Sequence, residues 1–164
     1  QGPIEAATAA FDGEEAQYPY YLHLYPSVLL GDGRGASLPW LQGAPDPLTT
    51  VAWQTWVEIN PATAQALGVD NGDVVRVESP HGAVEAPVYV FPAIRPDTVA
   101  IPLGQGHSDL GRYARERGSH ALHLVGANLA WSAARVRVIK LDKKQALARL
   151  ESTIDPGEDI HVPF

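Results

Sequence analysis

The sequence predicts a mainly β fold, a small closed barrel with short peripheral helices, and three observations support this. Six or so short segments have strand composition or alternate apolar and polar residues with period two. Turns rich in Gly and Pro separate them, and the expected helices are too few and too short to alternate with strands in a parallel sheet. The chain has 164 residues, 45% of them hydrophobic, which is enough to bury one core.

The first elements follow from composition and alternation. Residues 1–17 form an acidic lead that is expected to be flexible, and residues 18–30 predict one irregular strand interrupted by two prolines. Residues 31–50 hold four Gly and three Pro, which predicts a long loop rather than a helix or strand. Residues 51–59 alternate in the pattern of a half-buried strand, with Glu58 in the more polar set.

The most complete local signal marks a helix over residues 61–67. Asn60 suits the N-cap, Pro61 suits the first helical position, and Gly68 suits the left-handed residue that ends a helix. The sequence therefore predicts a helix of about two turns with both ends defined.

Four further strands complete the expected barrel. They lie near residues 73–79, 83–91, 97–103 and 134–141, and the first two form a hairpin around a turn at 80–82. In the last strand Val136 and Val138 are expected to face inward, and Arg135 and Arg137 outward.

Two more helices are expected outside these strands. One covers residues 108–117, and a short one begins at Asp142 and ends at Leu150. The barrel domain therefore takes in residues 18–141, and residues 142–164 form a short helix and an acidic tail.

The composition excludes several classes of protein. Without cysteine the chain can form no disulfide, no thiolate metal site, no iron–sulfur cluster and no cysteine nucleophile. No apolar run approaches the ~20 residues that span a bilayer, so no direct membrane insertion is expected. The chain has no Met even at position 1, which favours a piece of a longer polypeptide.

The net charge of −7 is concentrated at the two ends of the chain. Residues 16–150 carry eleven acids against twelve bases, so the body is almost neutral. Such a body can hold a phosphorylated ligand, but it has no broad basic face for a nucleic acid, and no nucleic-acid partner is expected.

The segment VAIPLGQGHSDLGRYA is the first candidate for chemistry. A strand, a glycine-rich turn and a helix start would direct free N–H groups at an anion, and Gly104 and Gly106 would allow its close approach. His107, Ser108 and Arg112 could add side-chain donors. The alternative is a tight connection that only needs positive φ, and the segment matches neither the dinucleotide fingerprint nor a P-loop.

The loop over residues 31–50 is the second candidate. Trp40 offers a stacking face, and Asp32, Arg34 and Gln42 offer partners for the edge of a planar heterocycle. The alternative is a solvent loop whose Trp40 packs back on the barrel. The pair His120 and His123 has no third ligand at a suitable spacing, so no metal site is expected there.

Taken together, WVEINPATAQALGVDNGDVVRVESPHGAVEAPVYVFPAIRPDTVAIPLGQGHSDLGRYARERG resembles the C-terminal molybdopterin-dinucleotide-binding domain of the dimethyl sulfoxide reductase (molybdopterin oxidoreductase) family. The motif is a Pro-started helix, LG, GD, V-x-V-x-S, a glycine turn and a glycine-rich strand exit, and the match covers residues 18–141. The segments PDPLTTVAWQTWVEINP and IPLGQGHSDLGRYA are most similar to catalytic subunits of polysulfide and thiosulfate reductases and to related respiratory-complex subunits. The resemblance implies a six-stranded double-psi β-barrel that covers the cofactor.

The resemblance also implies the ligand and the residues that contact it. The cofactor is molybdopterin guanine dinucleotide, bound in the full-length parent. The candidate contacts are Tyr25, Pro26, Ser27, Arg34, Trp40, Gln42, Gly104, Gln105, Gly106, His107, Arg112 and Tyr113. In this family the metal ligand comes from another domain, so the chain alone is expected to have no catalytic or metal-binding residue and no redox activity. His120 stands where close relatives often carry Asn, which puts one cofactor contact in doubt.

Partners and alternatives follow from the same resemblance. It implies contact with the remaining domains of the parent oxidoreductase, with iron–sulfur electron-transfer subunits and with membrane quinone-linked subunits, on the extracytoplasmic (periplasmic) side in a membrane complex. One alternative is a cofactor-less structural barrel, as in the iron–sulfur subunit of alternative complex III. Another is an independent hydrolase, for which the sequence lacks a convincing acid and base pair.

Overall fold

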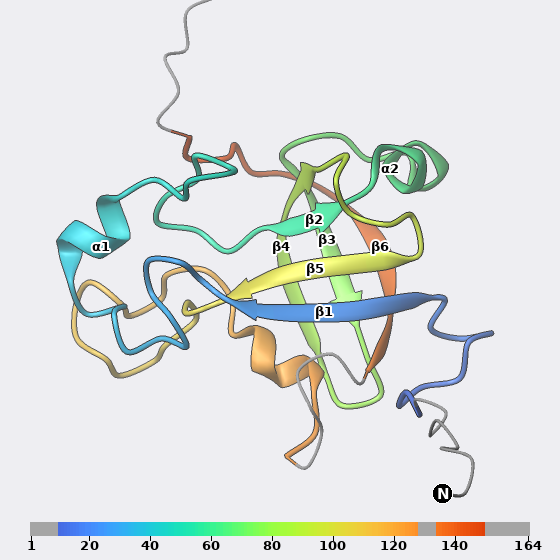
Figure 1. Cartoon of the computed structure of the whole chain (residues 1–164), viewed down its shortest axis with the longest axis horizontal. Coiled ribbons are helices and arrows are strands. Elements are labelled where there is room, and N and C mark those ends of the chain that lie inside the picture. The colour runs from blue at the N-terminus through green and yellow to red at the C-terminus, as the bar shows by residue number, and fades with distance from the viewer. Residues whose placement is uncertain (1–9, 128–133, 150–164) are drawn as a thin grey trace, which may run out of the picture.

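A computed structural model describes residues 10–127 and 134–149, and these form a closed barrel of six strands (Figure 1). The strands are β1 Tyr20–Pro26, β2 Val57–Ile59, β3 Asp73–Glu78, β4 Ala83–Val90, β5 Thr98–Leu103 and β6 Arg135–Lys144, in the spatial order β1-β5-β2-β4-β3-β6. The helices are α1 Pro39–Gly43, α2 Pro61–Leu67 and the 3₁₀ turn η1 Ala121–Leu124. The expected six-stranded double-psi barrel with short peripheral helices is confirmed.

The register brings two distant segments of the chain to one end of the barrel. β1 pairs with β5 in parallel, from Tyr21 opposite Thr98 to Pro26 opposite Leu103. Because parallel strands end on the same side of a sheet, residues 27–50 and 104–120 leave the barrel together (Figure 1). β2 and β4 are the other parallel pair, and the remaining strand contacts are antiparallel.

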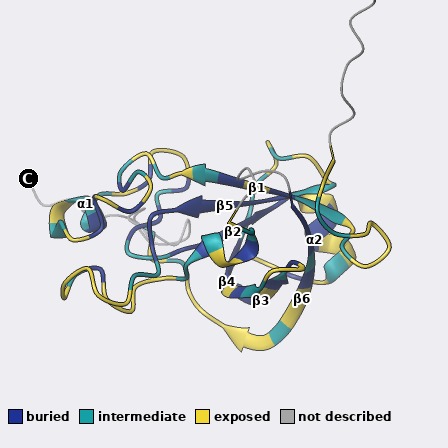
Figure 2. Ribbon diagram, turned by 90° about the horizontal axis from the view of Figure 1, so that it is seen from below, coloured by how far each residue is buried: buried dark blue, intermediate teal, exposed yellow. Residues whose placement is uncertain are grey.

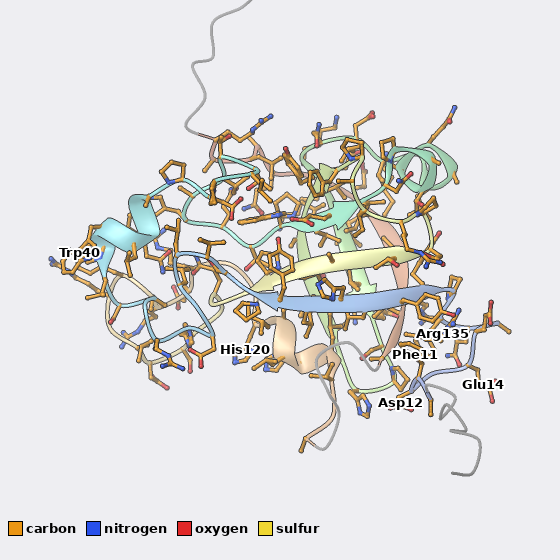
Figure 3. The ribbon with its side chains drawn as sticks, in the orientation of Figure 1. Phe11, Asp12, Glu14, Trp40, His120 and Arg135 are labelled. Atoms are coloured by element: carbon orange, nitrogen blue, oxygen red, sulfur yellow. The ribbon has the colours of Figure 1, made fainter. Side chains whose placement is uncertain are left out.

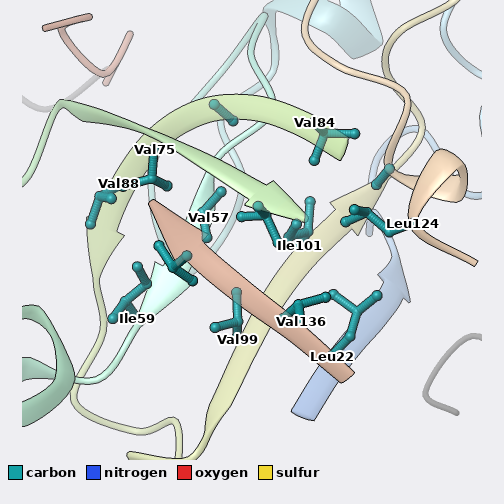
Figure 4. Close-up of a cluster of buried hydrophobic side chains, with 14 of the residues drawn as sticks. Leu22, Val57, Ile59, Val75, Val84, Val88, Val99, Ile101, Leu124 and Val136 are labelled. Carbon is teal, nitrogen blue, oxygen red and sulfur yellow. The ribbon is translucent and has the colours of Figure 1, made fainter. Parts of the chain in front are cut away.

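The inward positions of the strands form one hydrophobic core, which the expected alternation explains. In β1, Leu22 and Leu24 are buried while His23 between them is exposed. Leu124 of η1 joins the core from outside the sheet (Figure 4). Exposed positions concentrate in the loops, in α2 and in the last part of β6 (Figure 2).

The helix expected over residues 61–67 is confirmed with the expected caps. The side chain of Asn60 accepts a hydrogen bond from the amide of Ala62 at 2.9 Å, Pro61 opens the helix, and Gly68 ends it at φ +64°. Asn60 also donates through Nδ2 to the carbonyl of Ile94 at 2.6 Å. One side chain therefore caps α2 and ties it to the loop before β5.

Replacing Asn60 is expected to lower the free energy of unfolding of the domain. Asn60→Ala removes both hydrogen bonds, and loss of an N-cap alone costs about 1 kcal/mol. Asn60→Asp keeps the cap acceptor and loses only the donor to Ile94, so it should be the milder change. Urea unfolding of the two variants checks this order, and equal stability of Asn60→Ala and the wild type would contradict it.

The expected hairpin is also confirmed, and the next two strands lie close to their expected positions. β3 and β4 pair antiparallel from Val74 opposite Pro87 to Glu78 opposite Ala83. β5 and the first seven residues of β6 match the segments expected near 97–103 and 134–141.

The strand expected over residues 51–59 is wrong in its first half. Only Val57–Ile59 form β2, because Thr50 and Trp53 adopt positive φ values of 58° and 61°, which an extended strand cannot contain. Glu58 is buried and not on a solvated face.

The loop expected over residues 31–50 contains the short helix α1. Pro39 opens it, since proline suits the first helical turn, and it ends after Gly43. A helix of five residues is too short to show an amphipathic period, which is why composition alone predicts a loop here.

The helix expected over residues 108–117 is absent. Gly111 lies at φ +81° and Glu116 at φ +57°, so right-handed helix cannot run through the segment. Arg115 instead forms an isolated bridge with His107, and the amide of Gly106 donates to the carbonyl of Arg117 at 2.7 Å. The segment folds back along the glycine turn.

The helix expected over residues 142–150 is also wrong for residues 142–149, and Leu150 lies outside the described residues. β6 continues to Lys144, which pairs with Asp73, and the amide of Gln145 donates to the carbonyl of Gly72 at 2.8 Å. Pairing with β3 therefore overrides the local helix signal. The acidic tail after position 150 also lies outside the described residues.

The described part of the lead, residues 10–17, lies against the start of β6 (Figure 3). The amide of Arg135 donates to the carbonyl of Asp12 at 2.8 Å, and the ring of Phe11 lies 4.8 Å from that of Tyr21. Arg135 alternates out of the hydrophobic core, as expected, but its guanidinium is buried under this segment and donates to the carbonyl of Tyr18 at 2.9 Å. Among the described residues, no helix has the length and apolar character needed to cross a membrane.

Candidate functional site

Three loop segments meet at the end of the barrel where β1 and β5 finish (Figure 1). We call residues 27–43, 46–55 and 104–120 the loop face. The hydroxyl of Thr55 accepts from the amide of Ser119 at 2.9 Å, and the amide of Trp53 donates to the carbonyl of Gln42 at 3.1 Å. The two sequence candidates, the glycine-rich loop and the glycine turn, are therefore parts of one site.

A pair of buried side-chain amides links these two candidates. Gln105 donates to Gln42 at 2.7 Å, Gln42 donates back at 3.3 Å, and Gln42 also donates to the carbonyl of Ala36 at 2.9 Å. Gln42 is 1% exposed and Gln105 is 7% exposed. The family resemblance makes both of them candidate cofactor contacts, but in this structure their amides bond to each other and join the two loops.

Breaking the amide pair is expected to loosen the loop face. Gln42→Leu leaves the amide of Gln105 and the carbonyl of Ala36 without partners, at a combined loss of about 1 to 3 kcal/mol. The double variant Gln42→Leu/Gln105→Leu should lose less than the sum of the two single variants. A double-mutant cycle of urea unfolding measures this coupling, and strictly additive losses would contradict the pairing.

The glycine turn is tight, as the alternative interpretation of the sequence expects. Gly104 and Gly106 have φ values of 113° and 86°. A Cβ at Gly106 would lie closer than 3.0 Å to the backbone of Ser119 and His120. No helix follows the turn, and the Gly106 amide is already bonded, so the expected anion site at a helix start is not formed by the backbone.

Three histidine rings lie beside the turn. The ring centroid of His120 is 6.1 Å from that of His107 and 4.8 Å from that of His123, on which it stacks. Nε2 of His107 and Nδ1 of His120 are buried without a hydrogen-bond partner. Gly33 lies against the His107 ring, since a Cβ there would be 2.6 Å from Nε2. Within the described residues no three His, Asp or Glu side chains are placed to hold a metal ion.

Several predicted contacts lie on the exposed rim of the loop face. The Trp40 side chain is 68% exposed and lies at the outer edge of this end of the molecule (Figure 3). Arg34 forms an exposed ion pair with Asp32 at 2.9 Å, and Arg112 stacks over the ring of Tyr113 at 4.5 Å. Pro26 is exposed at the end of β1. These side chains are available to a ligand without any rearrangement of the core.

Two predicted contacts are used inside the protein. The hydroxyl of Ser27 accepts from the amide of Leu30 at 3.2 Å and so shapes the turn that follows β1. The hydroxyl of Tyr25 donates to the carboxylate of Glu58 at 2.5 Å, and the indole of Trp56 donates to the same oxygen at 3.0 Å. Tyr25 therefore faces the β2 side of the barrel.

The buried Glu58 is a special residue that the sequence analysis does not single out. Burial is the main cause that raises its pKa, while the bonds from Tyr25 and Trp56 act in the opposite direction. Burial and the neighbouring Glu58 raise the pKa of the Tyr25 hydroxyl. A carboxylate in the middle of an apolar strand between Trp56 and Ile59 is the sequence signal that could have identified it.

The fold and the site together define a small closed β-barrel domain with a polar, glycine-rich loop face at one end. The family model for the molydopterin dinucleotide binding domain matches residues 46–136. The chain therefore belongs to this family, and it is a molybdopterin dinucleotide binding domain of the molybdopterin oxidoreductases.

Individual relatives agree with this assignment. The chain is 35% identical over 103 residues to the molybdopterin-containing subunit of the arsenate respiratory reductase of Shewanella sp. strain ANA-3, covering 62% of this chain and 12% of that protein. It is 36% identical over 59 residues to the molybdopterin-containing subunit of the thiosulfate reductase of Salmonella typhimurium, covering 36% and 8%. Acetylene hydratase from Pelobacter acetylenicus has the same fold, with a TM-score of 0.59 at 18% identity over 83% of this chain and 21% of that one. The chain thus corresponds to a small part of its relatives.

Proposed function

We propose that the loop face is the surface through which this domain covers a molybdopterin guanine dinucleotide within a larger oxidoreductase. The observation that carries the proposal is the position of the sequence candidates. Residues as far apart in the sequence as Ser27, Gln42 and His107 lie at one end of the barrel, where the Gln42–Gln105 pair joins their segments.

The residues present fit a polar, phosphorylated ligand. Buried ring nitrogens of His107 and His120 lack partners, and an unpaired buried polar atom is rare in a folded protein. Trp40 supplies an exposed aromatic face, and Arg34 and Arg112 supply charged donors on the same rim. When bound, the cofactor supplies the redox chemistry through its metal, while this domain orients it and excludes water from one side.

The whole enzyme is proposed to be a respiratory reductase. Its relatives named above are subunits of an arsenate reductase and a thiosulfate reductase, and a further one is the periplasmic nitrate reductase of Desulfovibrio desulfuricans, at 32% identity over 106 residues. We propose, in line with this likeness, that the parent acts outside the cytoplasm with an iron–sulfur subunit and a quinone-linked membrane subunit as partners. This chain, without the other domains, is expected to show no turnover.

Two matched arginine variants of a full-length enzyme carrying this domain test the proposal. Arg112→Ala removes an exposed charge from the loop face, and Arg95→Ala removes one from the loop before β5, at the other end of that strand. A charged hydrogen bond contributes about 1.5 to 3 kcal/mol, so Arg112→Ala should lower molybdenum per protein roughly tenfold at limiting cofactor. Arg95→Ala should leave molybdenum content unchanged.

Trp40→Ala extends the same test to the stacking face. Its side chain is largely exposed, so the variant should retain the stability of the isolated domain and lose cofactor. Wild-type molybdenum content in both Trp40→Ala and Arg112→Ala would contradict the proposal and favour a barrel that serves only as a structural module.

A further inference from the structure

The histidine cluster beside the glycine turn contains more donor capacity than the protein itself uses. His107, His120 and His123 come from two segments, the turn after β5 and the 3₁₀ turn η1, and they line an open pocket of about 440 Å³ with Ser108 and Asp109. His120 is the central ring of the three. Two ring nitrogens of the cluster, Nδ1 of His120 and Nε2 of His107, are buried and have no hydrogen-bond partner among the described residues.

We infer that His107, His120 and His123 form a binding site for a doubly charged oxyanion, with the chemistry of a phosphate or sulfate group. The site lies on the loop face. If the oxyanion is a phosphate of the dinucleotide, the inference rests on the proposed function. The other possible source of the same chemical group is a free phosphate or sulfate ion.

The composition of the pocket favours an anion over a cation. Three imidazoles that gain protons become donors at both ring nitrogens. The one carboxylate lining the pocket, that of Asp109, is exposed and accepts a hydrogen bond from Ser108 at 3.0 Å. The described residues around the pocket provide no set of three metal ligands.

The surroundings of His120 influence its protonation. Burial, followed by the nearby His123 and His107, lowers the pKa of His120, so the charged form of this ring is disfavoured. The adjoining segments carry charged groups as well. They are Arg115, whose backbone forms a β-bridge with His107, and the exposed Asp32–Arg34 ion pair beside Gly33. The hairpin turn at Gly82 packs on the backbone of His123, and its neighbour His81 pairs with Asp12.

An oxyanion in this pocket would favour the protonated form of His120. A negative charge within about 4 to 6 Å favours the charged form of an imidazole and raises its pKa by about 1 unit or more. Binding is therefore expected to take up protons. Affinity for the anion should increase as the pH falls through the pKa of His120.

The experiment is an NMR titration of the histidine rings of the 164-residue chain, with sulfate as the probe. Sulfate is chosen because it does not itself change charge near neutral pH. At equal ionic strength, sulfate should raise the pKa of His120 by about 1 unit relative to chloride, and the effect should saturate with sulfate concentration. The ring signals of His81, which lies outside the pocket, are the internal control. Identical titrations of His120 in sulfate and chloride would overturn the inference.

Two variants separate this inference from the proposed function. His120→Asn should abolish the sulfate effect on His107 and His123, whereas His81→Asn should retain it. In a full-length enzyme, loss of molybdenum in Arg112→Ala without any sulfate effect in the isolated chain would overturn the oxyanion site and leave the cofactor face in place. A saturable sulfate effect with normal molybdenum in Arg112→Ala, Trp40→Ala and His120→Asn would support the site for a free oxyanion and reject the cofactor face.

Discussion

Replacing Gly106 by alanine is expected to be the most damaging single substitution on the loop face. The new Cβ would lie closer than 3.0 Å to backbone atoms of Ser119 and His120, which cannot swing aside as a flexible side chain can. The residue also has φ +86°, a conformation that L side chains rarely adopt. Strain and overpacking together should lower the free energy of unfolding by about 3 kcal/mol or more.

Gly111→Ala is the matched control for this prediction. Gly111 has nearly the same φ, +81°, but a Cβ there would have no atom within 4 Å apart from those of its chain neighbours. It should lose only the backbone contribution, about 1 to 2 kcal/mol. Urea unfolding of both variants measures the difference, and a full-length enzyme should lose molybdenum in Gly106→Ala alone. Equal stabilities would show that the 116–120 segment gives way and does not fix the turn.

Replacing Glu58 by leucine is expected to have the second-largest effect. The hydroxyl of Tyr25 and the indole of Trp56 would both lose their acceptor in a buried setting, at a combined loss of about 2 to 4 kcal/mol. Tyr25→Phe/Glu58→Leu removes one of the stranded donors, so it should be more stable than Glu58→Leu alone. Chemical denaturation of both variants checks this order, which the opposite ranking would contradict.

Glu58 should also give the domain a recognisable dependence on pH. Because its pKa is raised in the folded state above the ordinary 4.5, the folded chain binds this proton more tightly than the unfolded chain. The resulting stabilisation is complete below pH 4.5 and is lost as the pH rises through the folded pKa. Glu58→Gln cannot titrate, so its unfolding free energy relative to the wild type should increase from about pH 4 to about pH 7. A constant difference across that range would reject the raised pKa.

Elements whose signals lie within a few neighbouring residues could be predicted from the sequence. The helix α2 has its caps at Asn60 and Gly68, and the β3–β4 hairpin has its turn and alternation within one short segment. The segments at 108–117 and 142–150 also carry local helix signals, yet contacts with residues outside each segment decide their conformation. Arg115 bridges to His107, and Lys144 pairs with Asp73.

The site shows the same division between local and distant information. Glycine spacing identifies the turn at 104–107, and composition identifies the 31–50 loop as a functional candidate. Their convergence depends on the parallel pairing of β1 with β5, which no local pattern encodes. For the same reason the partnership of Gln42 with Gln105 and the burial of Glu58 are visible only in the structure.

The most direct test of the cofactor face is hydrogen exchange of a full-length enzyme carrying this domain, compared with and without its molybdopterin cofactor. The account predicts that cofactor binding slows amide exchange in residues 27–43, 104–107 and 116–120, where the loops meet. Exchange in α2 and in residues 91–97, at the other end of β5, should stay the same. Protection at that other end, or no change in the loop face, would contradict the account.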